Sequence, residues 1–172
     1  GSISFMGFDN TWISTDQIPL RYIDNGGGLY DSMDDTTGGD THRYSLNYEG
    51  WHDIAGKRLQ SNAYVIDYGL DLFSNYTYAT DTINGDQIRQ YDERQIIGGS
   101  VLFDVLPTKN GEWQIGMDMR HDHIGDVRLS ATKERITYDE LARHRIEETG
   151  FGLFIQNNHR WTDSFSTQLG AR

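Results

Sequence analysis

The chain has no cysteine, only two prolines and no long apolar run among its 172 residues. Without cysteine it can form neither a disulfide framework nor a thiolate zinc site. Its apolar runs are a few residues long, whereas a membrane-spanning helix needs about 20 apolar residues. This excludes a helical membrane protein. It leaves open a membrane β-barrel, whose strands place lipid-facing side chains only at every second position.

Positive charge is also scarce, because 26 acidic residues face 15 basic ones and the formal net charge is -11. Such a chain has no basic surface with which to neutralise a run of phosphates, so nucleic acid is excluded as a partner. No serine-hydrolase elbow, phosphate loop or metalloprotease helix motif occurs. Glu147 and Glu148 are adjacent and would point to opposite sides of a strand, which argues against a paired-carboxylate acid/base device. We therefore expect neither an enzyme nor a cofactor.

Apolar and polar residues alternate with the period of a β-strand along most of the chain. The clearest case is the segment 64–78, whose apolar side begins with Tyr64, Ile66 and Tyr68. The same pattern predicts further strands whose apolar sides carry Tyr44, Leu46 and Tyr48; Ile97, Gly99, Val101 and Phe103; Trp113, Ile115 and Met117; Phe151, Leu153 and Ile155; and Phe165, Thr167 and Leu169. The opening segment 3–15 is apolar on both sides, so its facing stays open. On the polar sides we expect a charge ladder across neighbouring strands, made of Asp67, Asp71, Arg94, Asp104, Asp118 and Arg120.

Long and short connections alternate between these segments. The long ones run from Asp16 to Thr41, from Thr80 to Tyr91 and from Asp122 to His144; the short ones run from Ile54 to Arg58, from Pro107 to Gly111 and from Trp161 to Ser164. Outer-membrane barrels combine short periplasmic turns with long extracellular loops, whereas soluble sandwiches have comparable loops at both ends. Trp51, Trp113 and Trp161 fall beside the short turns, and Tyr76, Tyr78 and Tyr91 fall at the long-loop end, as interfacial aromatic belts would.

These patterns predict an all-β fold, an antiparallel up-and-down meander of about seven long strands that is part of a larger transmembrane β-barrel. Bacterial barrels usually have an even strand count, and the polar sides are too rich in charge to pack as a dry core. We therefore expect residues 1–172 to be a partial barrel domain, truncated at both ends, with its polar sides around water or another domain.

Several strings resemble the mid-barrel region of TonB-dependent outer-membrane receptors. They are Asp16-Gln17-Ile18-Pro19, Asp34-Asp35-Thr36-Thr37-Gly38-Gly39-Asp40-Thr41, Arg43-Tyr44-Ser45-Leu46, Leu72-Phe73-Ser74-Asn75-Tyr76-Thr77-Tyr78, Asn84-Gly85-Asp86-Gln87 with Gln90 and Arg94, and Leu169-Gly170-Ala171-Arg172. The likeness extends over nearly the whole chain. The segment departs from the family's pattern in having no plug domain, no TonB box and no closing C-terminal strand.

The resemblance implies a transport function in the cell outer membrane of a Gram-negative bacterium. It implies uptake of a scarce extracellular ligand, such as a metal chelate (a siderophore), powered by the TonB energy-coupling complex through the missing plug. This segment would supply barrel wall in contact with outer-membrane lipid, and three loops that are candidates for touching ligand. Two alternatives remain: a passive outer-membrane porin or sugar channel, and a soluble β-rich binding module.

Other candidate sites are weak. The acidic stretch from Asp31 to Asp40 offers oxygens for calcium but lacks the EF-hand spacing, so we expect a solvated loop and no metal site. His121 and His123 share one strand face near the long-loop end, which is only half of a metal site. Asp16 before Pro19 predicts an N-cap and a short helix in the first long loop.

Overall fold

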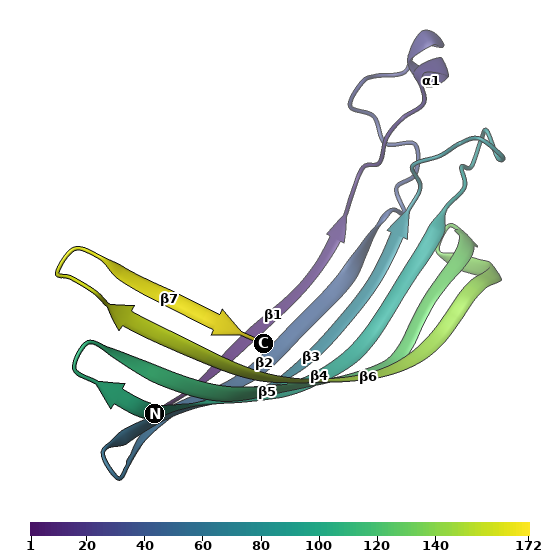
Figure 1. Cartoon of the computed structure of the whole chain (residues 1–172). Helices are drawn as coiled ribbons and strands as arrows, with labels where there is room; N and C mark the ends of the chain where they lie inside the picture. Colours follow the sequence, from purple (N-terminus) through teal and green to yellow (C-terminus); the bar gives the residue numbers. More distant parts are fainter.

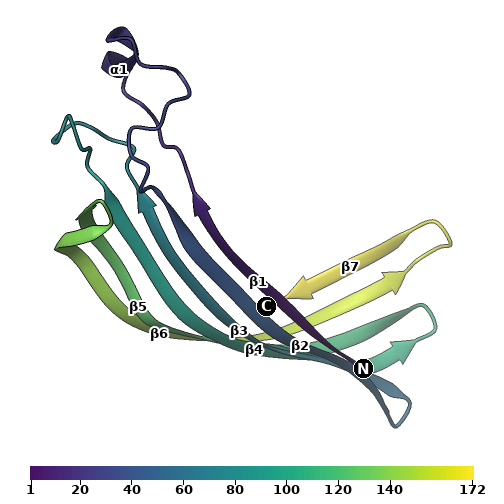
Figure 2. The ribbon, with the colours of Figure 1, turned by 180° about the vertical axis from the view of Figure 1, so that it is seen from behind.

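The computed structural model describes all 172 residues except the side chains of residues 106–108. Its elements, in chain order, are β1 (Ser2–Ile13), α1 (Leu20–Asp24), β2 (Gly38–Ile54), β3 (Lys57–Ser74), β4 (Ile88–Thr108), β5 (Gly111–Lys133), β6 (Ile136–Arg160) and β7 (Ser166–Ala171). The seven strands form one antiparallel sheet in the order of the chain, so the predicted all-β up-and-down meander is confirmed. Figures 1 and 2 show that the sheet is open, twisted and strongly curved, with α1 above the long-loop end.

The first four connections between the strands alternate between long and short, and only two connections in the sheet are long. Residues 14–37 join β1 to β2, and residues 75–87 join β3 to β4. The other connections are short, and the predicted turn from Pro107 to Gly111 is confirmed in a shorter form, because β4 continues to Thr108 and residues 109–110 join it to β5. The third predicted long loop, from Asp122 to His144, is wrong, because β5 continues to Lys133 and pairs with β6 from Ile136 onward.

The helix of the first long loop forms as predicted, but its cap differs. Its N-cap residue is Pro19, which has no capping side chain. Asp16 instead accepts a hydrogen bond from the backbone N–H of Asn75, at 2.6 Å. Across the described residues, no helix has the length and apolar character needed to cross a membrane.

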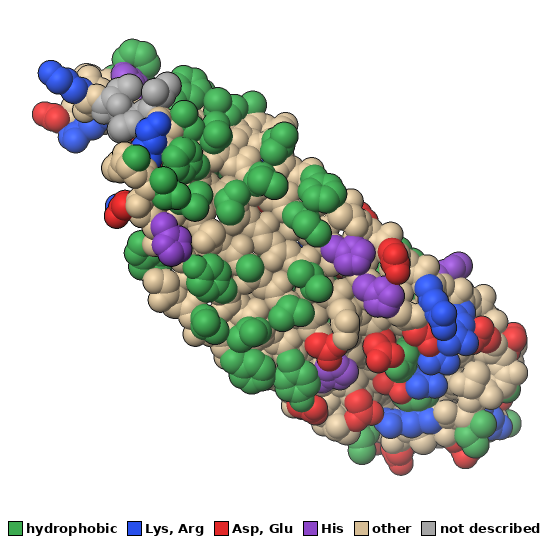
Figure 3. Space-filling model, turned by 90° about the horizontal axis from the view of Figure 1, so that it is seen from below, with side chains coloured by type: hydrophobic (Ala, Val, Ile, Leu, Met, Phe, Trp, Pro, Cys, Tyr) green, Lys and Arg blue, Asp and Glu red, His purple; other side chains and the backbone are tan. Residues whose placement is uncertain are grey.

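Register fixes which side chains share a face, because residues directly opposite in an antiparallel ladder point the same way. One such row joins Met117 to Val101 on β4 and to Leu153 on β6. The strands curve upward at both ends in Figure 1, and Figure 3 shows exposed apolar side chains gathered on the convex face seen from below. Because this row is apolar and 37–75% exposed, we assign it to that convex face. The concave face is more crowded: Ile96 is only 6% exposed there, whereas Leu153 on the convex face is 75% exposed.

The register also corrects the predicted facing of β3. Val65 pairs with Ile97, so the convex face of this strand carries Leu59, Ala63 and Val65. Tyr64, Ile66 and Tyr68 lie on the concave face, opposite Gly98, Ile96 and Arg94. The more apolar side of β3 therefore points away from the apolar faces of its neighbours.

The predicted charge ladder is divided for the same reason. Asp67 and Asp71 are on the convex face, whereas Arg94, Asp104, Asp118 and Arg120 are on the concave face. The concave charges pair locally, Arg94 with Asp92 and Arg120 with Asp122, where Arg120 Nε lies 2.6 Å from Asp122 Oδ2. The convex Asp71 forms a two-bond ion pair with Arg89, with both N–O distances at 2.7 Å.

Candidate functional site

A continuous apolar band covers the convex face in the half of the sheet nearer the short turns (Figure 3). Its members come from every strand: Ile3 and Phe5; Tyr44, Leu46 and Tyr48; Leu59, Ala63 and Val65; Ile97, Val101 and Phe103; Trp113, Ile115, Met117 and Met119; Phe151, Leu153 and Ile155; and Leu169 and Ala171. Most of the large members are 36–75% exposed. So much contiguous exposed apolar surface marks a surface that meets another apolar phase or partner.

The upper border of the band steps downward between β2 and β5. The last apolar residue before polar ones is Tyr44 on β2, Val65 on β3 and Met119 on β5. Met119 lies in the same hydrogen-bonded row as Tyr48, which is four residues below Tyr44. Between β2 and β5 the border therefore drops by four residues, or about 13 Å. It is level from Met119 to Phe151 on β6, and on β1 it ends at Phe5, in the row of Leu46.

Polar and imidazole side chains lie immediately above the band. His121 Nδ1 is 2.7 Å from Thr149 Oγ1, and His123 Nδ1 is 3.2 Å from Glu147 Oε1. The two histidines thus share the convex face, as predicted, but each contacts its own neighbour on β6. Glu147 and Glu148 oppose His123 and Asp122, which places them on opposite faces, also as predicted. No group of three or more His, Cys, Asp or Glu among the described residues could hold a metal ion.

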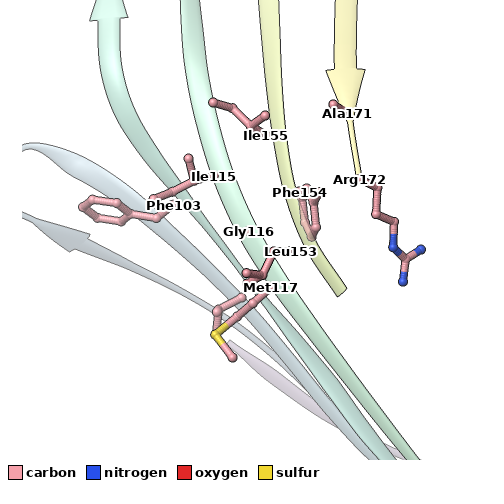
Figure 4. A pocket seen from close by; sticks show the side chains of 10 residues that line it. Phe103, Ile115, Gly116, Met117, Leu153, Phe154, Ile155, Ala171 and Arg172 are labelled. Carbon is pink, nitrogen blue, oxygen red and sulfur yellow. The ribbon is translucent and has the colours of Figure 1, made fainter. Parts of the chain in front are cut away.

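The short-turn end carries a shallow apolar groove on the convex face (Figure 4). Its volume is about 570 Å³, and its lining includes Phe103, Ile115, Met117, Leu153 and Ile155. These five side chains belong to the apolar band, but the lining also includes Gly116, Phe154 and Arg172, which do not. The predicted tryptophans are nearby: Trp113 is at the start of β5, Trp161 follows β6, and Trp51 is on the concave face opposite Gln60.

The opposite end of the sheet holds a buried polar cluster, the loop junction, formed by Asp16, Asp34, Thr36, Asn75, Gln87, Thr132 and Arg135. At its centre Gln87 is 2% exposed. Its Nε2 donates to Asp34 Oδ2 at 2.7 Å and to Thr36 Oγ1 at 2.8 Å. Its Oε1 accepts from Thr132 Oγ1 at 2.9 Å and from the backbone N–H of Arg135 at 3.0 Å. One carboxamide therefore joins residues from both long loops and from the β5–β6 hairpin.

Asp34 and Asn75 complete the loop junction. Asn75 is 1% exposed, and its Nδ2 donates to Asp34 Oδ2 at 2.7 Å and to the carbonyl of Asn84 at 2.9 Å. Burial alone would raise the pKa of Asp34. Hydrogen bonds from Thr36, Asn75 and Gln87 outweigh it and hold the pKa below its usual range. The carboxylate therefore stays ionised and acts as a fixed acceptor between the two loops.

The stretch from Asp31 to Asp40, considered as a weak calcium candidate, is occupied by internal bonds. Asp31 accepts from Tyr22 Oη and from the N–H of Gly28, and Asp34 belongs to the loop junction. Sequence reasoning singled out the strings around Asp34, Asn75 and Gln87. It missed Thr132 and Arg135, whose partners lie 45 and 48 residues away in the chain.

In comparisons with known proteins, no family model, no curated protein and no solved structure matches this chain.

Proposed function

We propose that this chain is a wall segment of an outer-membrane β-barrel that takes up a scarce ligand, such as a metal chelate, by TonB-dependent transport. The convex band would face lipid, the concave face would line the bore or contact a plug, and the two long loops with the β5–β6 hairpin would lie outside the cell. The observation that carries the proposal is the exposed convex band, to which all seven strands contribute in the half of the sheet nearer the short turns.

Three further features support the receptor over a soluble module. A soluble protein rarely exposes an apolar surface as extensive as this band. The concave face is lined by paired charges such as Arg94 with Asp92 and Arg120 with Asp122. Four of the strings that resemble TonB-dependent receptors meet at the loop junction, where Asp16 accepts from Asn75, and Asn75 and Gln87 both donate to the carboxylate of Asp34.

The experiment uses the protein that carries this segment, in its own cells. We expect it in the outer-membrane fraction, and we expect uptake of a radiolabelled ferric chelate to stop when the gene is disrupted and when the inner-membrane proton gradient is dissipated. Ungated ion conductance of the purified protein in planar bilayers, with uptake insensitive to the gradient, would instead establish a passive channel. Recovery of a soluble monomer without detergent would establish the binding module.

A further inference from the structure

The tip of the β5–β6 hairpin is bonded to parts of the chain that are distant in sequence. Arg135 Nε donates to the carbonyl of Thr36 at 2.7 Å, across 99 residues. Its guanidinium carbon is 4.9 Å from the ring centroid of Phe73 at the end of β3. The backbone N–H of Thr132 donates to the carbonyl of Gln87 at 2.8 Å. The tip therefore contacts the ends of both long loops.

The backbone of the tip is also shaped for these contacts. Glu134 and Arg135 have φ angles of 50° and 66°, in the left-handed region that non-glycine residues rarely adopt. This conformation places the N–H of Arg135 on Gln87 Oε1. A two-residue hairpin turn of this kind needs left-handed residues at both positions, as at Ala55-Gly56, so the turn sets the conformation and the bond to Gln87 adds to it.

We propose that the hairpin tip is a latch, in which Arg135 and Thr132 hold Gln87 and thereby fix loops 14–37 and 75–87 relative to the strands. Gln87 transmits the constraint because its Oε1 accepts from the tip while its Nε2 donates to Asp34 and Thr36. If the tip detaches, Gln87 Oε1 loses both of its partners, and we expect the two loops to be released together as one cooperative unit. The latch goes beyond the proposed function, since it concerns how the loops are held whatever they bind.

The first test is hydrogen exchange on the folded protein that carries this segment, comparing Arg135→Ala with Arg145→Ala. Arg145 is an exposed arginine on the same hairpin, farther along β6 from the tip, and is the matched control. We expect Arg135→Ala to raise the exchange rates of Ser14, Thr36 and Asp86 by about tenfold or more, with the β2–β3 ladder unchanged. Arg145→Ala should change none of them. Faster exchange confined to residues 132–136 would overturn the latch.

A second variant, Gln87→Glu, tests the carboxamide itself with almost no change of shape. It places a second carboxylate against that of Asp34, so at neutral pH the two repel and both loops should exchange faster. As the pH falls toward about 4 the pair takes up a proton, and protection should return. The wild-type protein should show no such dependence. Equal protection of Gln87→Glu and wild type at every pH would contradict the latch, without bearing on membrane insertion or transport.

Discussion

At the scale of single residues, Asp86 organises the second long loop. Its carboxylate accepts hydrogen bonds from the N–H groups of Thr80, Asp81 and Ala79 and from Thr77 Oγ1. These bonds, first those from Thr80 and Asp81, lower its pKa to about 2. A carboxyl whose pKa falls on folding stabilises the fold above its unfolded pKa of about 3.9, and loses that contribution as the pH falls through its folded pKa.

We therefore expect Asp86→Asn to destabilise the protein at pH 7, and the difference from wild type to shrink between about pH 4 and pH 2. The measurement is the denaturant midpoint followed by tryptophan fluorescence at a series of pH values. Asp35→Asn is the control, because Asp35 is exposed and the same charge is removed from the first loop. A pH-independent difference between Asp86→Asn and wild type would refute this role.

Glycines in the strands make room for aromatic side chains on the neighbouring strand. A Cβ on Gly98 would lie 2.4 Å from Tyr64 Oη and 2.9 Å from the backbone oxygen of Met119. A Cβ on Gly150 would meet nothing within 4 Å. We expect Gly98→Ala to lower the free energy of unfolding by about 1–3 kcal/mol and Gly150→Ala to change it by less than about 0.5 kcal/mol. If the two substitutions changed the free energy of unfolding equally, the close contact of Gly98 with Tyr64 and Met119 would not limit the side chain at this position.

Sequence patterns locate Asp34, Asn75 and Gln87 of the loop junction, but neither Thr132 and Arg135 nor the bonds of the junction. The strings containing Asp34, Asn75 and Gln87 stand out as sequence, yet a polar loop residue is ordinarily solvated. Their burial depends on partners 41 and 53 residues apart in the chain. Nothing local in the sequence distinguishes the buried Gln87 from Gln90, which is exposed three residues later.

At the scale of elements, turns decide where strands end. The β2–β3 turn is Ala55-Gly56, with φ angles of 53° and 77°, and the β5–β6 turn is Glu134-Arg135. Two-residue hairpin turns with both residues left-handed normally use Asn-Gly or Asp-Gly. The turn at Glu134-Arg135 contains neither of these dipeptides. Without that signal, the sequence pattern predicted a long loop from Asp122 to His144, where the chain forms a hairpin.

We expect Ala55→Asn to stabilise the β2–β3 hairpin by about 0.5–1 kcal/mol, because asparagine tolerates the left-handed region better than alanine. Ala55→Val should act in the opposite direction, since a β-branched side chain is disfavoured there. Equilibrium unfolding of both variants measures the difference. The two variants having the same stability would mean that this turn is not under conformational constraint.

At the scale of the whole molecule, the two faces of the sheet divide between different surroundings. Period-two alternation correctly assigned the convex residues of β2, β4, β5 and β6. It failed for β3, because the concave side of that strand, with Tyr64, Ile66 and Leu70, is more apolar than its convex side. The pairing of β3 with β4 identifies which side of β3 is convex. The sequence of one strand alone separates its two sides but does not tell which of them is the convex one.

The most direct measurement of the proposed wall is nitroxide scanning of single-cysteine variants in lipid bilayers, which suits a chain that has no cysteine of its own. We predict high oxygen accessibility at Ile115, Met117 and Val65, and high accessibility to a water-soluble nickel complex at Asp118, Arg120 and Tyr64. The alternation should therefore follow the register across β3 and β5. Equal oxygen accessibility at Val65 and Tyr64, or both sets shielded from both reagents, would contradict a lipid-facing convex band.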